Sequence, residues 1–480
     1  MNDNRRNFLK IGSLAGLGIA SGSVLAACQT KTENNTIAAA TSASNGRENK
    51  GQIFNMSGYK APKLDKVRIG FVGLGMRGPH AVQRMSYIEG VEIKALCDIR
   101  PKQLDKVLQT LEGTAHKPDL YSDGPDAWKK MFDRDDIDLL YIATPWDLHT
   151  PMAVYGMEAG KHVAVEVPAA KTIEECWQLV ETSERTKKHC MMLENCCYDF
   201  FELLTLNMAR QGYFGEIIHG EGAYIHDLVD LNFNKENGYE SMWRLKENIG
   251  RNGNLYATHG LGPICQIMNV NRGDQMDYLT SLSSNDFSMH QRAVELAKED
   301  SFYQDYTGAD FRGNMNTTMV KTKKGRSIMI QHDVSSPRPY SRIHLVSGTE
   351  AMARKWPSPQ RIAKGHSWLK EDQMQEVEEK YTPEIIKKVG ALAKQVGGHG
   401  GMDFIMDWRL IDCLRNGLAL DQDVYDAALW SAISPLSEQS VANRAQSIDV
   451  PDFTRGAWKT NAPVDISLQG AGNTNVLLRK

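Results

Sequence analysis

The sequence predicts an α/β fold, with a doubly wound parallel sheet followed by a second α+β domain that contains an open, mostly antiparallel sheet. Two patterns support this prediction: short β-rich runs alternate with helical patterns up to about residue 193, and longer alternating runs begin at residue 216. The composition, 41% hydrophobic and 24% charged over 480 residues, is typical of a globular protein with two or three domains.

Five β-rich runs define the predicted parallel sheet, at residues 67–72, 91–98, 137–144, 162–167 and 189–193. Helical patterns follow at residues 79–89, 150–159 and 172–186, and the last begins with Thr172 and Glu175 at the spacing of a capping box. In such sheets, ligands bind beyond the carboxyl ends of the strands. We therefore expect residues 145–149, 166–168 and 194–195, which follow three of the strands, to face one crevice.

A glycine-rich motif, residues 73–78, joins the first strand to the first helix, and Asp98 ends the next strand 20 residues beyond Gly78. This pattern is the fingerprint of a Rossmann dinucleotide-binding domain. Gly73 permits the turn, Gly75 lets the backbone approach a pyrophosphate, and Gly78 lets the helix pack close to the strand. A purely structural turn would leave the spacing of Asp98 unexplained. Because Asp98 would accept from both ribose hydroxyls and repel a 2′-phosphate, we predict NAD rather than NADP.

The second half of the chain has a different pattern of predicted strands and helices. After a helical pattern at residues 198–211, alternating runs occur at residues 216–225, 277–284, 315–321, 327–333 and 342–346, and helical patterns return at residues 403–415 and 424–443. Residues 356–394 are rich in charge and give no clear element. We predict an NAD-binding domain at residues 61–196, a substrate-binding sheet domain at 197–450 and a C-terminal tail at 451–480.

The N-terminus reads as an export signal. Arg5 and Arg6 precede a weakly apolar run, residues 11–27, that ends at Cys28. We predict a twin-arginine signal with a lipobox at residues 1–28 and a polar, flexible tether at 29–60. The expected location is the periplasm or cell envelope, with lipidated Cys28 as the only membrane attachment. Simple cleavage beside an incidental cysteine is the alternative.

Charge and cysteine spacing exclude other classes. With 56 Lys+Arg against 59 Asp+Glu, the chain has no basic excess for nucleic acid. The eight cysteines include no C-x-x-C pair, and we expect no metal site. A homo-oligomer stays open.

The Rossmann pattern, a Glu-X-Pro turn at residues 166–168 and the later sheet resemble the Gfo/Idh/MocA oxidoreductases over about residues 65–440. The usual member carries Glu-Lys-Pro, whose lysine helps proton transfer at a substrate hydroxyl. This chain has Val167 at that position, and Lys171 lies four residues further on. Since valine cannot move a proton, the sequence disfavours ordinary sugar-dehydrogenase chemistry.

Longer motifs resemble glycoside hydrolase family 109, whose members are NAD-using α-N-acetylgalactosaminidases. They are Gly-Leu-Gly-Met-Arg-Gly (73–78), Trp-Asp-Leu-His (146–149), Glu-Val-Pro-Ala-Ala (166–170), Glu-Asn-Cys-Cys-Tyr (194–198), Tyr-Ala-Thr-His-Gly (256–260) and Gly-Gly-His-Gly-Gly-Met-Asp (397–403). The resemblance implies a glycan or glycoconjugate substrate. It also implies oxidation of the sugar at C3, elimination of the C1 aglycone, addition of water and re-reduction, with NAD regenerated.

The same resemblance assigns site residues. Besides the glycines, the NAD-contacting positions are Met76, Arg77, Asp98, Trp146, His149, Glu166, Val167, Asn195 and Tyr256. The sugar-contacting positions are Tyr224, Arg244, Tyr256, His259 and Tyr340. We expect His259 and Tyr256 to be catalytic, whereas His399, among four glycines, is expected to order a loop.

Three classes of protein stay open at this point: the NAD-dependent glycosidase, an exported sugar or polyol dehydrogenase that exchanges free NAD(H), and a non-catalytic sugar-binding lipoprotein. Val167 argues against the second class, and the Tyr256 and His259 pair argues against the third.

Overall fold

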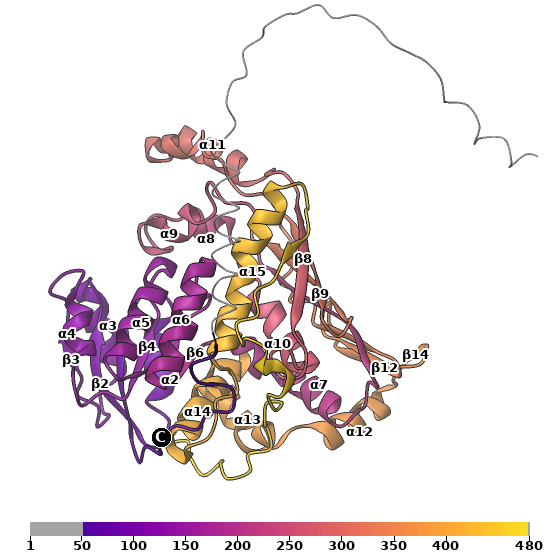
Figure 1. Ribbon diagram of the computed structural model, residues 1–480. Helices are drawn as coiled ribbons and strands as arrows, with labels where there is room; N and C mark the ends of the chain where they lie inside the picture. The colour runs from indigo at the N-terminus through magenta and orange to yellow at the C-terminus, as the bar shows by residue number, and fades with distance from the viewer. Residues whose placement is uncertain (1–50, 479–480) are drawn as a thin grey trace, which may run out of the picture. The chain divides into compact units, whose positions relative to one another are not determined.

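Two β-sheets organise the part of the chain that the computed structural model describes, residues 51–478 (Figure 1). The predicted export signal and residues 29–50 of the predicted tether lie outside these residues. Among the described residues, no helix has the length and apolar character needed to cross a membrane.

The first sheet has six strands in the order β3-β2-β1-β4-β5-β6, all parallel. The strands are β1 (Val67–Val72), β2 (Val91–Cys97), β3 (Asp119–Tyr121), β4 (Leu139–Ile142), β5 (His162–Val165) and β6 (Cys190–Met192). Every residue of β4 and β5 is buried, as expected for a parallel sheet covered on both faces. The strand order reverses between β1 and β4, and such a reversal opens a ligand crevice beyond the strand ends.

Helices connect these strands: α2 (Gly78–Met85), α3 (Pro101–Thr110), α4 (Ala127–Phe132), α5 (His149–Glu158) and α6 (Ile173–Thr186). The predicted capping box is confirmed, because Glu175 N donates to Thr172 Oγ1 and Thr172 N donates to Glu175 Oε2, each at 3.1 Å. No sequence pattern predicted β3, α3 or α4. The predicted doubly wound sheet is nevertheless confirmed.

The second sheet has nine strands in the order β14-β13-β12-β11-β7-β10-β9-β8-β15. They are β7 (Ile217–Ile225), β8 (Met276–Ser283), β9 (Asn316–Thr322), β10 (Ser327–Asp333), β11 (Leu345–Gly348), β12 (Ala351–Arg354), β13 (Arg361–Lys364), β14 (Ser367–Trp368) and β15 (Ile448–Asp449). Only β7 and β10 pair in parallel within this sheet, so the predicted mostly antiparallel sheet is confirmed.

Two predictions for this half need correction. The strand predicted from residue 342 begins at Leu345, because Ile343 and His344 have φ of 59° and 47°, which extended strands do not adopt. The segment left unassigned, residues 356–394, contains β13, β14, α12 (Glu371–Tyr381) and most of α13 (Glu384–Val396).

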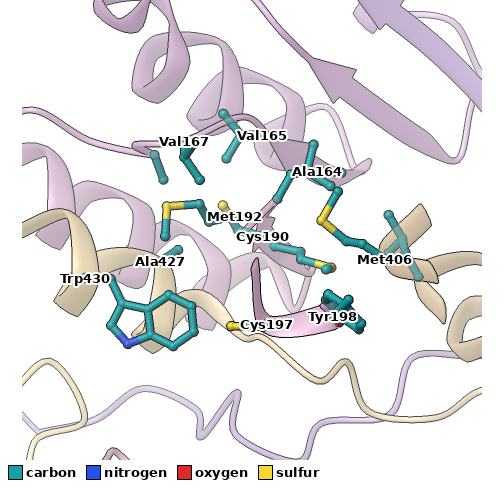
Figure 2. Close-up of a cluster of buried hydrophobic side chains, with 14 of the residues drawn as sticks. Ala164, Val165, Val167, Cys190, Met192, Cys197, Tyr198, Met406, Ala427 and Trp430 are labelled. Atoms are coloured by element: carbon teal, nitrogen blue, oxygen red, sulfur yellow. The ribbon is translucent and has the colours of Figure 1, made fainter. Parts of the chain in front are cut away.

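The remaining helices are α7 (Phe200–Arg210), α8 (Val229–Phe233), α9 (Trp243–Lys246), α10 (Thr258–Met268), α11 (Met289–Glu299), α14 (Met402–Asn416) and α15 (Val424–Ala442). Helix α14 packs on α2, and α15 packs on both α6 and β8. Figure 2 shows Met406 of α14 and Trp430 of α15 among side chains of β5 and β6, including Ala164 and Met192. These two helices, predicted to belong to the sheet domain, therefore also cover the first sheet.

Both ends of the described chain pack against this body. Met56 is buried and its N–H donates to the Tyr425 hydroxyl at 3.2 Å, while Ile53 N donates to Glu184 Oε2 at 3.1 Å. The prediction of a flexible tether is therefore wrong for residues 51–60. The segment predicted as a C-terminal tail also packs, since Phe453 is buried and Trp408 Nε1 donates to Thr474 O at 3.1 Å.

Candidate active site

The glycine loop between β1 and α2 has the geometry of a dinucleotide cradle. Gly73 has φ of 87°, and a Cβ there would lie 2.6 Å from the Ala143 carbonyl carbon. A Cβ on Gly78 would lie 2.1 Å from Gly73 O, so both positions require glycine. A Cβ on Gly75 would meet only Arg100 Nη2, at 3.5 Å, which leaves the space that a pyrophosphate would fill.

Asp98 lies directly after β2 and is buried. Its Oδ2 accepts from Leu74 N at 2.7 Å, and its Oδ1 accepts from Arg100 Nε at 3.0 Å. The carboxylate therefore supports the glycine loop from the side where a Rossmann domain holds the adenosine ribose. Met76, at the tip of the loop, is 45% exposed and open to a cofactor. These residues fit NAD.

Arg77 connects the loop to the rest of the crevice. It pairs with Glu166 at 3.0 Å and with Asp403 at 3.1 Å. Burial acts to raise the pKa of Asp403, but Arg77, His399 and Arg84 outweigh it and hold that pKa well below its usual value. Asn195 Nδ2 also donates to Asp403, so Asp403 gathers two of the predicted cofactor residues, Arg77 and Asn195, around an ionised carboxylate.

An aromatic cluster continues from the cofactor side to the predicted sugar side. Trp146 stacks on Tyr256 with 5.7 Å between ring centroids, and the ring of Tyr224 lies 4.7 Å from that of Tyr256. The Arg244 guanidinium lies 4.7 Å from the Tyr256 ring centroid and donates to the Tyr239 hydroxyl at 2.7 Å. Tyr256 thus contacts residues of both predicted sets, the cofactor residue Trp146 and the sugar residue Tyr224.

His259 completes this cluster from the first turn of α10. Its ring centroid lies 4.9 Å from that of Tyr256, and its Nδ1 lies 2.8 Å and 2.9 Å from the two carboxylate oxygens of Glu194. Tyr340 is more peripheral, with its ring 6.3 Å from Tyr224 and 5.0 Å from His226. The structure therefore brings together all five predicted sugar-contacting residues.

Two predicted cofactor residues point into the protein interior. His149 is 1% exposed, and its ring nitrogens lie 2.7 Å from Pro168 O and 2.8 Å from Thr144 O. Burial lowers the pKa of this histidine. Its ring holds together the loops that follow β4 and β5. Val167, which lies in the loop after β5, is also buried.

Lys171 does not occupy the position of the missing lysine. Its ammonium is held by Asp147 and by Glu247, the latter at 2.6 Å. The two carboxylates keep the lysine in an ion-paired network at the edge of the crevice.

No sequence pattern assigned a role to Asp403, Tyr239 or His226, whereas Glu194 was expected only to face the crevice and His399 only to order a loop. His399 is the most accessible of the histidines in the site, with a side chain 56% exposed and Nδ1 at 2.9 Å from Asp403 Oδ2. The four glycines around it and His399 itself all have positive φ. That glycine pattern was the available signal for a special loop, whereas nothing in the sequence indicated the pairing with Asp403.

The fold and the site define a protein of the NAD-binding oxidoreductase class, with a cluster of aromatic residues beside the cofactor cradle. Comparison with known families agrees: the model for the NAD-binding Rossmann fold of the Gfo/Idh/MocA oxidoreductases matches residues 67–194, and the model for the C-terminal domain of glycosyl hydrolase 109 matches residues 198–460. The chain belongs to glycosyl hydrolase family 109. NAD is its cofactor, and it is a glycosidase, as the sequence predicted.

Relatives and solved structures support these assignments. An α-N-acetylgalactosaminidase of Bacteroides fragilis is 53% identical over 84% of this chain and 95% of its own length. A glycosyl hydrolase family 109 protein of Shewanella putrefaciens is 44% identical over 97% of this chain and 99% of its own. Levoglucosan dehydrogenase with NADH and levoglucosan shares the fold, with a TM-score of 0.61 and 18% identity over 81% of this chain and 100% of that one.

Proposed function

We propose that the protein removes terminal α-linked N-acetylgalactosamine from glycans or glycoconjugates without net consumption of NAD. The name of the Bacteroides fragilis relative supports this substrate. The observation that carries the mechanism is the stacking of Tyr256 between the two halves of the site: it touches Trp146 on the cofactor side and His259 and Tyr224 on the sugar side. A sugar held there adjoins the cofactor.

When bound, NAD⁺ would supply the hydride acceptor for C3 of the sugar at the start of the turnover and the hydride donor at its end. The resulting C3 ketone acidifies the C2 hydrogen. A base then takes that proton, the C–H electron pair forms the C1=C2 double bond, and the C1–O bond breaks with its electrons on the leaving oxygen. Water adds at C1, a proton returns to C2, and the products are the free sugar and the alcohol.

His259 suits the role of the C2 base better than Tyr256. Burial raises the pKa of Tyr256 well above its usual value, so the phenol keeps its proton and acts as a donor. The Arg244 cation, next to Tyr256, can stabilise negative charge that develops on the sugar oxygens. His399, exposed and held by Asp403, is the group we assign to protonate the leaving oxygen.

A sugar or polyol dehydrogenase that exchanges NAD(H) is the second candidate. The shared fold of levoglucosan dehydrogenase is its support. Val167 and the ion-paired Lys171 weigh against it, because neither residue can exchange a proton with a substrate hydroxyl.

We further propose export by the twin-arginine route and lipid anchoring at Cys28, on the sequence of residues 1–28. This route carries folded proteins, which agrees with a cofactor that is bound in the cytoplasm and retained.

Hydrolysis of nitrophenyl α-N-acetylgalactosaminide in deuterated water tests the mechanism. Elimination replaces the C2 hydrogen with deuterium, and thio-linked glycosides are also cleaved, because the elimination expels a thiolate, a leaving group that needs no proton from His399. Purified protein should release NAD on denaturation and should need no added NAD⁺. Product without deuterium at C2, or NAD⁺ consumed in proportion to product, would contradict the proposal.

A further inference from the structure

Glu194 and His259 form a carboxylate and imidazole pair that joins two distant parts of the chain. Glu194 follows β6 and is fully buried, whereas His259 lies in the first turn of α10 and its side chain is 14% exposed. Both carboxylate oxygens lie within 2.9 Å of His259 Nδ1. The imidazole is therefore held from the interior side.

Glu194 is ionised in this position. Complete burial acts to raise the pKa of Glu194, but His259 and the Cys196 N–H outweigh burial and lower that pKa below its usual value. Cys196 N donates to Glu194 Oε1 at 3.0 Å, and Gln422 Nε2 donates to the Glu194 backbone oxygen at 3.0 Å. On the helix side, Gly262 leaves room for Glu194, because a Cβ there would lie 3.0 Å from Glu194 Cγ.

An ionised carboxylate determines which nitrogen of His259 carries the proton. The carboxylate can only accept, so Nδ1 must donate, and in the neutral ring Nε2 then keeps its lone pair. Within residues 51–478, no hydrogen bond reaches His259 Nε2. The free nitrogen lies on the side of the ring away from Glu194.

Glu194 and His259, together with Cys196, also place three atoms of metal-binding type within 4.8 Å of one another. The distances distinguish a hydrogen-bonded pair from a metal site. Two ligands of a tetrahedral Zn²⁺, with bonds of about 2.1 Å, stay about 3.4 Å apart. The 2.8 Å between His259 Nδ1 and Glu194 Oε1 is instead the length of a hydrogen bond.

We propose that Glu194 is the positioning residue of the reaction: it holds His259 in the Nδ1-protonated tautomer and so makes Nε2 the base at C2 of the sugar. The inference rests on the proposed elimination mechanism. In that step the C2–H electron pair enters the C1=C2 bond, the proton moves to His259 Nε2, and Glu194 stays ionised and compensates the imidazolium charge.

The Glu194→Gln variant gives a sharp test because the amide is expected to bind in one orientation. Cys196 N–H keeps the amide oxygen at the Oε1 position, so the amide NH₂ takes the Oε2 position and donates to His259 Nδ1. The amide N–H thus competes for Nδ1 as an acceptor, and the neutral amide oxygen at the Oε1 position, 2.8 Å from Nδ1, holds the Nδ1 proton less strongly than the carboxylate does. Nε2 is then less often free to act as the base. We expect kcat to fall about 100-fold or more, with KM and NAD content little changed. Deuterium incorporation at C2 should slow in parallel with kcat.

The pH profile separates positioning from a structural role. The groups around His259 are Glu194, Cys196, Tyr224, Tyr256, His226, Arg244 and His399. Because the carboxylate of Glu194 faces the reacting imidazole, removal of its negative charge should move the acidic limb of log kcat against pH to lower pH. Glu194→Asp, which keeps the charge, should leave the limb in place and recover part of kcat.

Glu184→Gln is the matched control, because Glu184 is also fully buried but is bonded to Tyr425 and Arg455. It should keep kcat, the pH limb and deuterium exchange. The positioning role is overturned if Glu194→Gln keeps wild-type kcat and C2 exchange, or if it loses activity with an unmoved pH limb. Failure of the elimination mechanism is seen separately, as wild-type product without deuterium at C2.

Discussion

Arg100 and Glu240 form an ion pair across the crevice, from the end of β2 to the segment before α9, with 2.5 Å between Arg100 Nη1 and Glu240 Oε2. The same guanidinium donates from Nε to Asp98, the carboxylate at the predicted ribose position. A residue of the predicted substrate-binding domain therefore binds the arginine that holds Asp98 at the cofactor cradle.

Breaking this ion pair should increase the rate at which NAD dissociates. In Glu240→Gln we expect NAD to dissociate about 2- to 5-fold faster at low salt, since an exposed ion pair contributes up to about 1 kcal/mol. Because salt screens such pairs, the difference should shrink at high ionic strength. Loss of bound NAD after rapid dilution measures the rate. Asp230→Asn, which breaks the exposed pair with Arg292, serves as control, and an equal effect of both variants would contradict this role of the Arg100 pair.

Asp98→Ala should weaken NAD binding more than Glu240→Gln does. The carboxylate has two roles, because it supports the glycine loop through Leu74 N and is predicted to bind the ribose. Loss of hydrogen bonds to a charged group corresponds to an affinity at least about 10-fold weaker. Nucleotide released from denatured protein gives the occupancy, with the exposed Asp105→Ala as control. Unchanged occupancy in Asp98→Ala would show that the ribose lies elsewhere.

The loss of kcat in His399→Ala should depend on the leaving group of the substrate. If His399 protonates the leaving oxygen, natural glycosides should lose about 100-fold in kcat, whereas activated nitrophenyl glycosides should lose much less. His290→Ala, an exposed histidine of α11, should change neither. Equal losses on both kinds of substrate would rule out the acid role.

Two buried histidines should make the fold sensitive to acid. Burial, with help from Lys188, lowers the pKa of His162 to about 3, and burial also lowers that of His189, whose ring is 5.1 Å away. Below pH about 6.5 the unfolded chain takes up protons that the folded chain refuses, so stability should fall as pH drops, by up to about 1.4 kcal/mol per unit for each histidine. Urea unfolding between pH 8 and about 5 measures this slope. His162→Asn should reduce it, and an unchanged slope would contradict the assignment.

The export proposal concerns residues outside the described part of the chain. Cys28→Ser should move the protein from the membrane fraction to the soluble fraction, and joint replacement Arg5→Lys and Arg6→Lys should keep it in the cytoplasm. Fractionation of cells followed by immunoblotting gives the result. A Cys28→Ser protein that remains in the membrane fraction would exclude lipidation as the anchor.

Much of the first sheet and its cofactor cradle could be predicted from the sequence. The glycine loop, Asp98 and the Thr172 capping box are local patterns, in which a tight turn, a strand end or a helix start requires particular residues at short spacing. The substrate residues around Tyr256 came from the resemblance to a family rather than from any local pattern.

Only the tertiary structure decided which charged groups meet in the site. Glu194 and His259 are 65 residues apart in the chain, and Arg77 and Asp403 are 326 apart. Their pairing depends on how α10 packs against the segment that follows β6, residues 195–198, and on how α14 packs against α2 and β1. Periodicity carries no information about that packing. The same reason explains the error at residues 51–60: their composition resembles a linker, but the hydroxyl of Tyr425 and the carboxylate of Glu184, brought together by α15 and α6, bind their backbone.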